Sequence, residues 1–375
     1  MSSPATGAVG ADALVIGGGL HGLSSALHLA RRGLRVHLLE RDYCGRHASG
    51  VNAGGVRTLG RAPAEIPLAL ASRDEIWRVA EDYLGSDCGF VPSGQLQVLE
   101  TADDVAAARV RVDRLRRLGY AHEVLIGPEE VRERVPRIAE HVQGGIWVAG
   151  DGYAWPYGAV MAFHAAALRA GVGIREGAEV SRVWRQGGQW HVRAGDRVFS
   201  APALVNAAGA WAHRIAGQVG DPAPVQVDGL MLMVTQRTAH FLDPVLGGSS
   251  RPLSLKQFAN GTVVIGGGLR CGLDAARRAA EVDLMTLWPS ARTVVGLFPH
   301  LAAVPIARAW GGVEAFTPDG IPVIGRGREE GVVHAFGFSA HGFELGPIVG
   351  RIVSELLCDG ASRLPIEAFS VDRFR

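Results

Sequence analysis

The sequence of 375 residues has almost no net charge, +1 at pH 7, and therefore no electrostatic attraction to nucleic acid or to an anionic membrane. No apolar run approaches the ~20 residues that a membrane-spanning helix needs. Residues 1–10 are small and polar and lack the apolar segment of a secretory signal. These absences predict a cytoplasmic protein, either free or peripheral to the inner face of the membrane, with no nucleic-acid partner.

Cysteines are few and scattered, at Cys44, Cys88, Cys271 and Cys358, with no C-x-x-C pair and no metal-ligand spacing. We therefore expect no metal site, and free thiols in a reducing compartment. Hydrophobic residues make up 47% and charged residues 20% of the chain, as in a globular protein with a sizeable core. A chain of this length predicts about two domains.

A glycine-rich turn follows the first apolar run, residues 13–16, which has the pattern of a strand buried on both faces. Gly17, Gly19 and Gly22 fit the pattern G-x-G-x-x-G. The first glycine allows the turn, the second lets backbone approach a pyrophosphate, and the third lets helix and strand pack closely. A helix from about Gly22 would direct its unpaired N–H groups at the phosphates.

The second apolar strand, residues 34–39, ends in Glu40. A carboxylate there can accept hydrogen bonds from both hydroxyls of an adenosine ribose and would repel a 2′-phosphate. An acid at this spacing argues against a glycine turn without a ligand. The segment predicts a dinucleotide site but leaves open whether NAD or FAD binds.

Residues 44–61 are rich in small residues without an apolar period. Such a run suits backbone lying against a flat ligand, or a flexible surface loop. Arg57 and Arg61 among the glycines are consistent with binding of an anion, either cofactor phosphate or substrate carboxylate.

The middle of the chain alternates helical and strand patterns. We expect helices at 65–83, 102–118 and 159–171, with the arginines of the second on a solvated face. Residues 89–99 predict a strand pair that enters another domain. The aromatic turn at 151–158 fits core or hinge packing, or the wall of a substrate pocket.

The strand at 203–206 leads into small residues and a helix start, which predicts a second place where backbone closes over the dinucleotide. Residues 225–310 are strand-rich. Gly266–Gly268 precede no apolar helix, so we reject them as a phosphate loop. Toward the C-terminus, a sharp turn and strand at 309–325 and a strand at 332–338 precede a helix with apolar residues at helical spacing.

Taken in order, four motifs carry a resemblance that covers essentially the whole chain. They are Gly17-x-Gly19-x-x-Gly22 with Glu40, Asn206-Ala-Ala-Gly209, Thr317-Pro-Asp-Gly320-x-Pro322-x-x-Gly325, and Gly337-x-x-x-His341-Gly342. With them the chain resembles the FAD-dependent amino-acid oxidoreductases that include D-amino acid oxidase, glycine oxidase and sarcosine oxidase. An NAD-dependent dehydrogenase would have no reason to carry the last two motifs.

The resemblance implies an α/β fold, α+β overall: a Rossmann-like FAD-binding domain of glutathione-reductase type with an inserted antiparallel-sheet substrate domain. The FAD domain would comprise residues 1–85, 143–217 and 318–375, and the substrate domain residues 86–142 and 218–317. The N-terminus of the C-terminal helix would face the flavin N1–C2=O edge.

The resemblance also implies site residues. Arg57 would bind the substrate carboxylate, as the matching arginine of monomeric sarcosine oxidase does, and His341 would face the flavin or cap the last helix. The implied cofactor-binding residues are Gly17, Gly19, Leu20, His21, Gly22, Glu40, Arg41, Ser49, Asn52, Ala53, Gly54, Gly55, Val180, Ala207, Ala208, Gly209, Trp211, Gly337, His341, Gly342 and Phe343.

Two positions depart from the family. Glu314 stands near the place where glycine and D-amino acid oxidases are expected to carry a carboxylate-binding arginine, which argues against their pocket. Gly312 stands where sarcosine oxidase has a cysteine linked to FAD. We therefore predict non-covalent FAD, which acid or heat precipitation should release.

Within the family, residues 44–61 look most like those of bacterial cis-4-hydroxy-D-proline dehydrogenases. This implies oxidation of a secondary-amine (or primary-amine) amino acid to its imine by hydride transfer from Cα to flavin N5. The alternatives are a sarcosine- or glycine-type oxidase that makes hydrogen peroxide, and the FAD subunit of a heteromeric complex like opine oxidase. The expected partners are an amino-acid substrate, an electron acceptor (a respiratory carrier or O₂) and other subunits in a homo- or hetero-oligomer.

Overall fold

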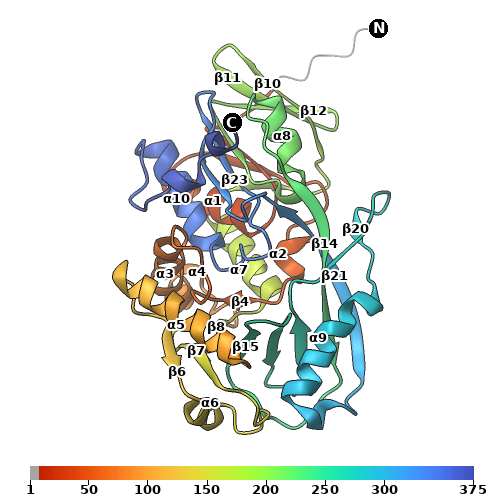
Figure 1. Ribbon diagram of the computed structural model, residues 1–375. Helices are drawn as coiled ribbons and strands as arrows, with labels where there is room; N and C mark the ends of the chain where they lie inside the picture. Colours follow the sequence, from red (N-terminus) through yellow and green to blue (C-terminus); the bar gives the residue numbers. More distant parts are fainter. Residues whose placement is uncertain (1–7) are drawn as a thin grey trace.

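The computed structural model describes residues 8–375 and shows a mixed α/β fold built on two main sheets (Figure 1). A six-stranded sheet has the order β22-β23-β13-β2-β3-β9 and is parallel except for β22. Its strands are β2 (Ala13–Ile16), β3 (Val36–Leu39), β9 (Gly173–Arg175), β13 (Ala203–Asn206), β22 (Val323–Arg326) and β23 (Val332–Phe336). Distant parts of the chain thus meet in one sheet, as a Rossmann-like FAD domain requires.

Helices α1 (Leu20–Arg31), α7 (Pro156–Arg169) and α10 (Gly346–Cys358) pack together beside this sheet. Close approach of α1 and α10 depends on glycine, because a Cβ added at Gly350 would lie 2.2 Å from the Ser24 hydroxyl oxygen. The Ser24 hydroxyl donates to the Pro347 carbonyl oxygen at 2.9 Å, which also joins the two helices. The first and last helices of the nucleotide-binding region therefore form one unit.

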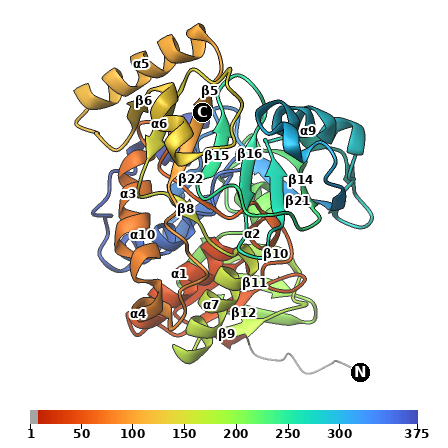
Figure 2. The same ribbon diagram turned by 90° about the horizontal axis from the view of Figure 1, so that it is seen from below.

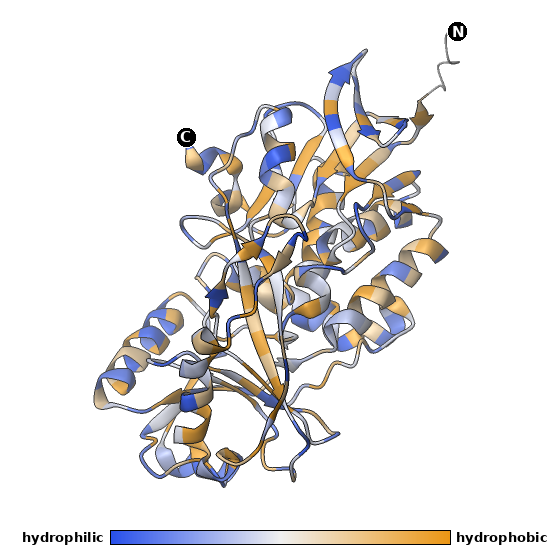
Figure 3. Cartoon of the chain, turned by 90° about the vertical axis from the view of Figure 1, so that its right-hand side faces the viewer, coloured by the Kyte–Doolittle hydropathy of each residue, from blue (hydrophilic) through white to orange (hydrophobic). Residues whose placement is uncertain are grey.

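A smaller sheet extends from the same region, at the top of Figure 1. It has the order β1-β12-β11-β10, and its strands are β1 (Val9–Gly10), β10 (Val180–Gln186), β11 (Gln189–Ala194) and β12 (Arg197–Ala201). Helix α8 (Ala212–Gln218) packs beside it. Figure 3 shows the central strands mostly apolar, whereas the outer helices carry both apolar and polar residues.

The second main sheet has nine strands, and its pairings are antiparallel except for that of β15 with β5. Figure 2 shows its helices around it: α5 (Ala102–Arg117), α6 (Pro128–Arg134) and α9 (Leu284–Leu297). The strands are β5 (Gln95–Leu99), β6 (Val124–Ile126), β7 (Gly144–Val148), β14 (Gln226–Thr235), β15 (Val245–Gly248), β16 (Ser254–Gln257), β17 (Val263–Gly266), β18 (Arg270–Cys271) and β21 (Ile306–Phe316).

The predicted fold class, an FAD domain with an inserted sheet domain, is confirmed. The exact domain boundaries stay a prediction; β7 pairs within the large sheet although it falls in the predicted middle FAD segment, 143–217. The predicted helix at 65–83 is divided into α3 (Ile66–Glu75), a 3₁₀ turn and α4 (Ala80–Leu84). Helix α1 begins at Leu20 rather than at Gly22.

No helix among residues 8–375 has the length and apolar character to cross a membrane.

Candidate functional site

A cavity of about 730 Å³ extends from the carboxyl ends of the parallel strands to the large sheet. Ligands of open α/β sheets bind in this place, outside the carboxyl ends of the strands. Residues of both main sheets and of the loops between them line the cavity, so a ligand inside it would touch segments that lie far apart in the sequence.

The glycine turn at one end of the cavity has the geometry that the motif predicts. Gly17 has a φ of +111°, and a Cβ added there would lie 2.2 Å from the Ala207 carbonyl oxygen. A Cβ at Gly22 would lie 1.9 Å from the Gly17 carbonyl oxygen. Both positions thus need glycine for close backbone packing. Gly19 and His21, at the start of α1, line the cavity.

Glu40 completes this end of the site. Its Oε2 accepts the Gly18 N–H at 2.6 Å and its Oε1 accepts the Asp42 N–H at 2.8 Å. Burial raises the pKa of the carboxyl, and the two amides oppose that rise. Each carboxylate oxygen keeps a further lone pair for a hydroxyl group. The residues present therefore fit an adenosine ribose.

A cationic and aromatic wall stands beside Glu40. The Arg41 guanidinium lies 3.8 Å from the centre of the Trp211 ring and pairs with Asp42 at 2.9 Å. At the start of α1, the His21 ring stacks on Phe338 with centroids 3.7 Å apart. Burial lowers the pKa of His21 to about 3, so that ring is neutral.

The structure brings nearly all predicted site residues to one cavity. These are Gly17, Gly19, His21, Glu40, Arg41, Ser49, Asn52, Ala53, Gly54, Gly55, Arg57, Val180, Ala207, Ala208, Gly209, Trp211, Gly337, His341, Gly342 and Phe343. Leu20 and Gly22 do not line it. The Leu20 side chain is fully buried in the core, and only its backbone N–H serves the turn, by donating to the Ser49 hydroxyl at 3.0 Å.

The loop at 52–55 is held in place by a hydrogen bond between its own residues and by a lysine that the sequence analysis did not identify. The Asn52 Oδ1 accepts the Gly54 N–H at 2.6 Å. Lys256, on β16, donates to the Ala53 carbonyl oxygen and lies 4.9 Å from the centre of the Tyr153 ring. Burial lowers the pKa of Lys256 to about 7. The available signal was that Lys256 is the only lysine in the sequence and follows apolar strand residues.

Arg57 lines the cavity and has no acidic side chain bonded to it among residues 8–375. Its Nη1 donates only to the Leu59 carbonyl oxygen, at 2.7 Å. Burial and the neighbouring Arg61 lower its pKa to about 10, which leaves the guanidinium charged at neutral pH. This is the arrangement expected of a group that binds a carboxylate from the ligand.

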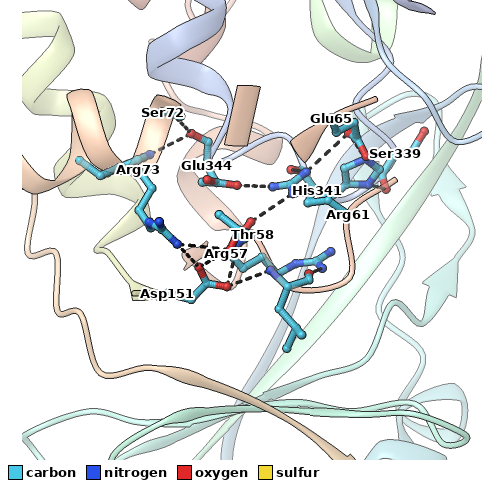
Figure 4. Close-up of polar contacts among 12 residues, drawn as sticks. Arg57, Thr58, Arg61, Glu65, Ser72, Arg73, Asp151, Ser339, His341 and Glu344 are labelled. Carbon is cyan, nitrogen blue, oxygen red and sulfur yellow. Dashed lines mark hydrogen bonds and ion pairs between the residues drawn. The ribbon is translucent and has the colours of Figure 1, made fainter. Parts of the chain in front are cut away.

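A buried acid holds the backbone beside Arg57 (Figure 4). The Oδ2 of Asp151 accepts the N–H groups of Thr58 and Leu59 at 2.7 and 2.9 Å. Its Oδ1 accepts the Thr58 hydroxyl at 2.8 Å and lies 3.3 Å from the Arg73 Nη1. The sequence did not identify Asp151, because it lies far from Thr58 along the chain. It belongs to the turn at 151–158, which was interpreted only through its aromatic residues.

Arg61 does not serve the role that its sequence context allowed. Its Nη2 donates to the Glu344 Oε2 at 2.7 Å and its Nη1 to the His341 carbonyl oxygen at 2.8 Å. Glu65 lies 3.6 Å from the same guanidinium. Arg61 is buried and fully engaged, so it fixes the loop before α10 and is not available for a ligand anion (Figure 4).

His341 lines the cavity and does not cap the last helix. The N-terminal cap of α10 is Leu345, without a side-chain cap. The His341 Nδ1 lies 2.8 Å from the Ser339 carbonyl oxygen, and its Nε2 lies 2.8 Å from the Glu65 Oε1. Burial lowers the pKa of the ring. These two contacts hold the ring in place, which favours a role as part of the cavity wall. Its predicted catalytic role stays a prediction.

The glycine turn, the ribose-binding acid and the cavity fit an FAD molecule that extends from the parallel sheet to the large sheet. A family profile described as "FAD dependent oxidoreductase" matches residues 12–356. The chain belongs to this family. It is an FAD-dependent oxidoreductase, and the predictions of cofactor and family are confirmed.

Several known proteins are similar over nearly the whole chain. The bifunctional protein ThiO/ThiG of Synechocystis sp. is 28% identical over 97% of this chain, which spans about half (54%) of that relative's length. The sarcosine oxidase subunit beta of Rhizobium meliloti is 27% identical over 97% of this chain and 88% of its own. The crystal structure of L-proline dehydrogenase from P. horikoshii matches with a TM-score of 0.90 and 27% identity over 98% of each chain.

Proposed function

We propose that this flavoenzyme oxidises an amino acid with a secondary amine to its imine, with cis-4-hydroxy-D-proline as the first candidate substrate. Bound FAD supplies the acceptor for the hydride that leaves Cα. The chain itself must bind the carboxylate, orient the Cα–H bond and keep the site closed to water.

Arg57 carries this proposal. A charged guanidinium at the cavity wall, without an acidic partner in the described part of the chain, is matched by an α-carboxylate in the ligand. The loop that bears it is held by Asp151, so the guanidinium is positioned before a substrate arrives.

The relatives favour a secondary amine. Proline and sarcosine, in the names of the L-proline dehydrogenase and the sarcosine oxidase subunit, both have a nitrogen bonded to two carbons. The sarcosine oxidase relative is, by its name, one subunit of a larger enzyme. That observation favours a second candidate function, in which this chain is the FAD-bearing subunit of a heteromeric amine oxidase.

A substrate screen tests the proposal. The purified protein, alone, would be incubated with a dye acceptor and cis-4-hydroxy-D-proline, D-proline, sarcosine or glycine. We expect the fastest dye reduction with a cyclic secondary amine, and the cyclic imine as product. Activity that appears only after a partner subunit is added supports the second candidate. Peroxide formed in air without dye identifies an oxidase.

A further inference from the structure

Glu314 lies on the wall of the cavity that Arg57 also lines. It is part of β21, and Gly312, two residues earlier on the same face, lies against α2 (Ala48–Val51). A Cβ added at Gly312 would lie 2.6 Å from a Val51 methyl carbon. This face of β21 therefore turns toward the small-residue loop and the cavity, not toward solvent.

The other acidic residues that line the cavity have partners within the protein. Glu40 accepts the backbone N–H groups described above. Glu179 pairs with Arg278 at 3.1 Å. No cationic side chain of residues 8–375 offsets the burial of Glu314, and only the backbone amides of Ala340 and Ala315 do so.

Burial without a cation has a measurable cost for a carboxylate. It raises the pKa of Glu314 to about 7. A buried charge without a partner is unfavourable unless a ligand supplies the opposite charge. Arg57, in the same cavity, is a cation to which no acidic side chain of residues 8–375 is bonded.

The arginines that line the cavity differ in this respect. Arg41 pairs with Asp42 and Arg61 with Glu344, whereas Arg46 and Arg214 are exposed to solvent. Arg57 and Glu314 are thus the partly buried charged residues of the cavity wall that form no ion pair within residues 8–375. An α-amino acid zwitterion carries a carboxylate and an ammonium group, and it would match both.

We propose that Glu314 binds the ammonium group of the substrate while Arg57 binds its carboxylate, so that the site selects zwitterionic amino acids over uncharged isosteres. This inference rests on the proposed function and identifies the Glu314 carboxylate as the group that binds the substrate amine.

Two half-substrates separate the two contacts in the oxidised holoenzyme. Pyrrolidine carries the ring cation without a carboxylate, and tetrahydrofuran-2-carboxylate carries the carboxylate with an uncharged ring oxygen. Their binding is measured by the change in flavin absorbance. In Glu314→Gln we expect the Kd of pyrrolidine to rise by about tenfold or more, the worth of a charged hydrogen bond, and that of tetrahydrofuran-2-carboxylate to change by less than about twofold.

The matched control is Glu179→Gln, which removes another acid of the cavity wall and should leave both Kd values unchanged. Glu314→Asp keeps the charge and should recover part of the pyrrolidine affinity. Equal pyrrolidine binding by Glu314→Gln and Glu179→Gln, or equal weakening of both probes in Glu314→Gln, overturns the inference. If Glu314→Gln does not retain FAD, the wild-type enzyme decides: binding of tetrahydrofuran-2-carboxylate without binding of pyrrolidine overturns it.

The outcomes also distinguish this inference from the proposed function. If no amino acid reduces the flavin of the wild-type enzyme, the proposed function is wrong. If amino acids reduce it and Glu314→Gln alters neither the pyrrolidine affinity nor the substrate KM, the role of Glu314 alone is wrong.

Discussion

Replacing Asp151 by Asn should both destabilise the protein and weaken substrate binding. The Asp151 carboxylate accepts two N–H groups, one hydroxyl and an arginine contact, and its side chain is 0% exposed. An Asn amide keeps one oxygen for the Thr58 and Leu59 N–H groups, so its NH₂ must face the Thr58 hydroxyl and the Arg73 guanidinium. The variant therefore loses the negative charge at position 151 and places an NH₂ donor opposite the Arg73 guanidinium, which is also a donor.

The expected loss of unfolding free energy is about 2–4 kcal/mol, because hydrogen bonds to a buried charge contribute about 1.5–3 kcal/mol each. The same change releases the loop that carries Arg57, and we expect the KM of the amino-acid substrate to rise about tenfold, since small misplacements of a binding group have large effects. Urea unfolding of the holoenzyme and steady-state kinetics measure the two effects.

Asp74→Asn is the matched control, because Asp74 binds the same Arg73 at 2.8 Å but is 42% exposed. An exposed ion pair contributes at most about 1 kcal/mol, so this variant should unfold nearly as the wild type does and keep its KM. Equal stability and equal KM in the two variants would refute the assignment of Asp151 as the residue that positions the loop.

Three further predictions concern single residues. Arg57→Ala should raise the substrate KM about 30- to 100-fold with flavin absorbance retained, while the exposed Arg46→Ala changes little; an unchanged KM in Arg57→Ala contradicts the carboxylate-binding role. Glu40→Ala should weaken FAD binding by about tenfold or more in a fluorescence titration, and equal affinity would exclude its ribose contact. Burial lowers the pKa of Lys256 to about 7, whereas the unfolded chain keeps that proton up to about pH 10.5. The stability of the wild type should therefore rise relative to that of Lys256→Met as the pH increases across this window. A difference in urea unfolding that stays constant with pH contradicts the lowered pKa.

The nucleotide end of the site could be predicted from sequence because local pattern and local structure coincide there. Gly17, Gly22 and Glu40 act through the backbone of neighbouring residues, and a strand–turn–helix motif places them. The fold class followed from the order of such motifs along the chain.

The substrate end depended on pairings that no local pattern records. Arg57 and Arg61 are equivalent by sequence context, yet Glu344, which is remote in the chain, pairs with Arg61 and leaves Arg57 available. Asp151 likewise acts on Thr58 across the fold. The side chains that decide which charges stay unpaired come from separate elements, so their roles become evident only in three dimensions.

Anaerobic titration of the purified yellow protein with a cyclic secondary amino acid tests the central claim most directly. The account predicts that the flavin absorbance near 450 nm is lost on addition of about one equivalent and that the amino acid is recovered as its imine. A colourless protein, or a flavin whose absorbance no amino acid alters, would contradict it.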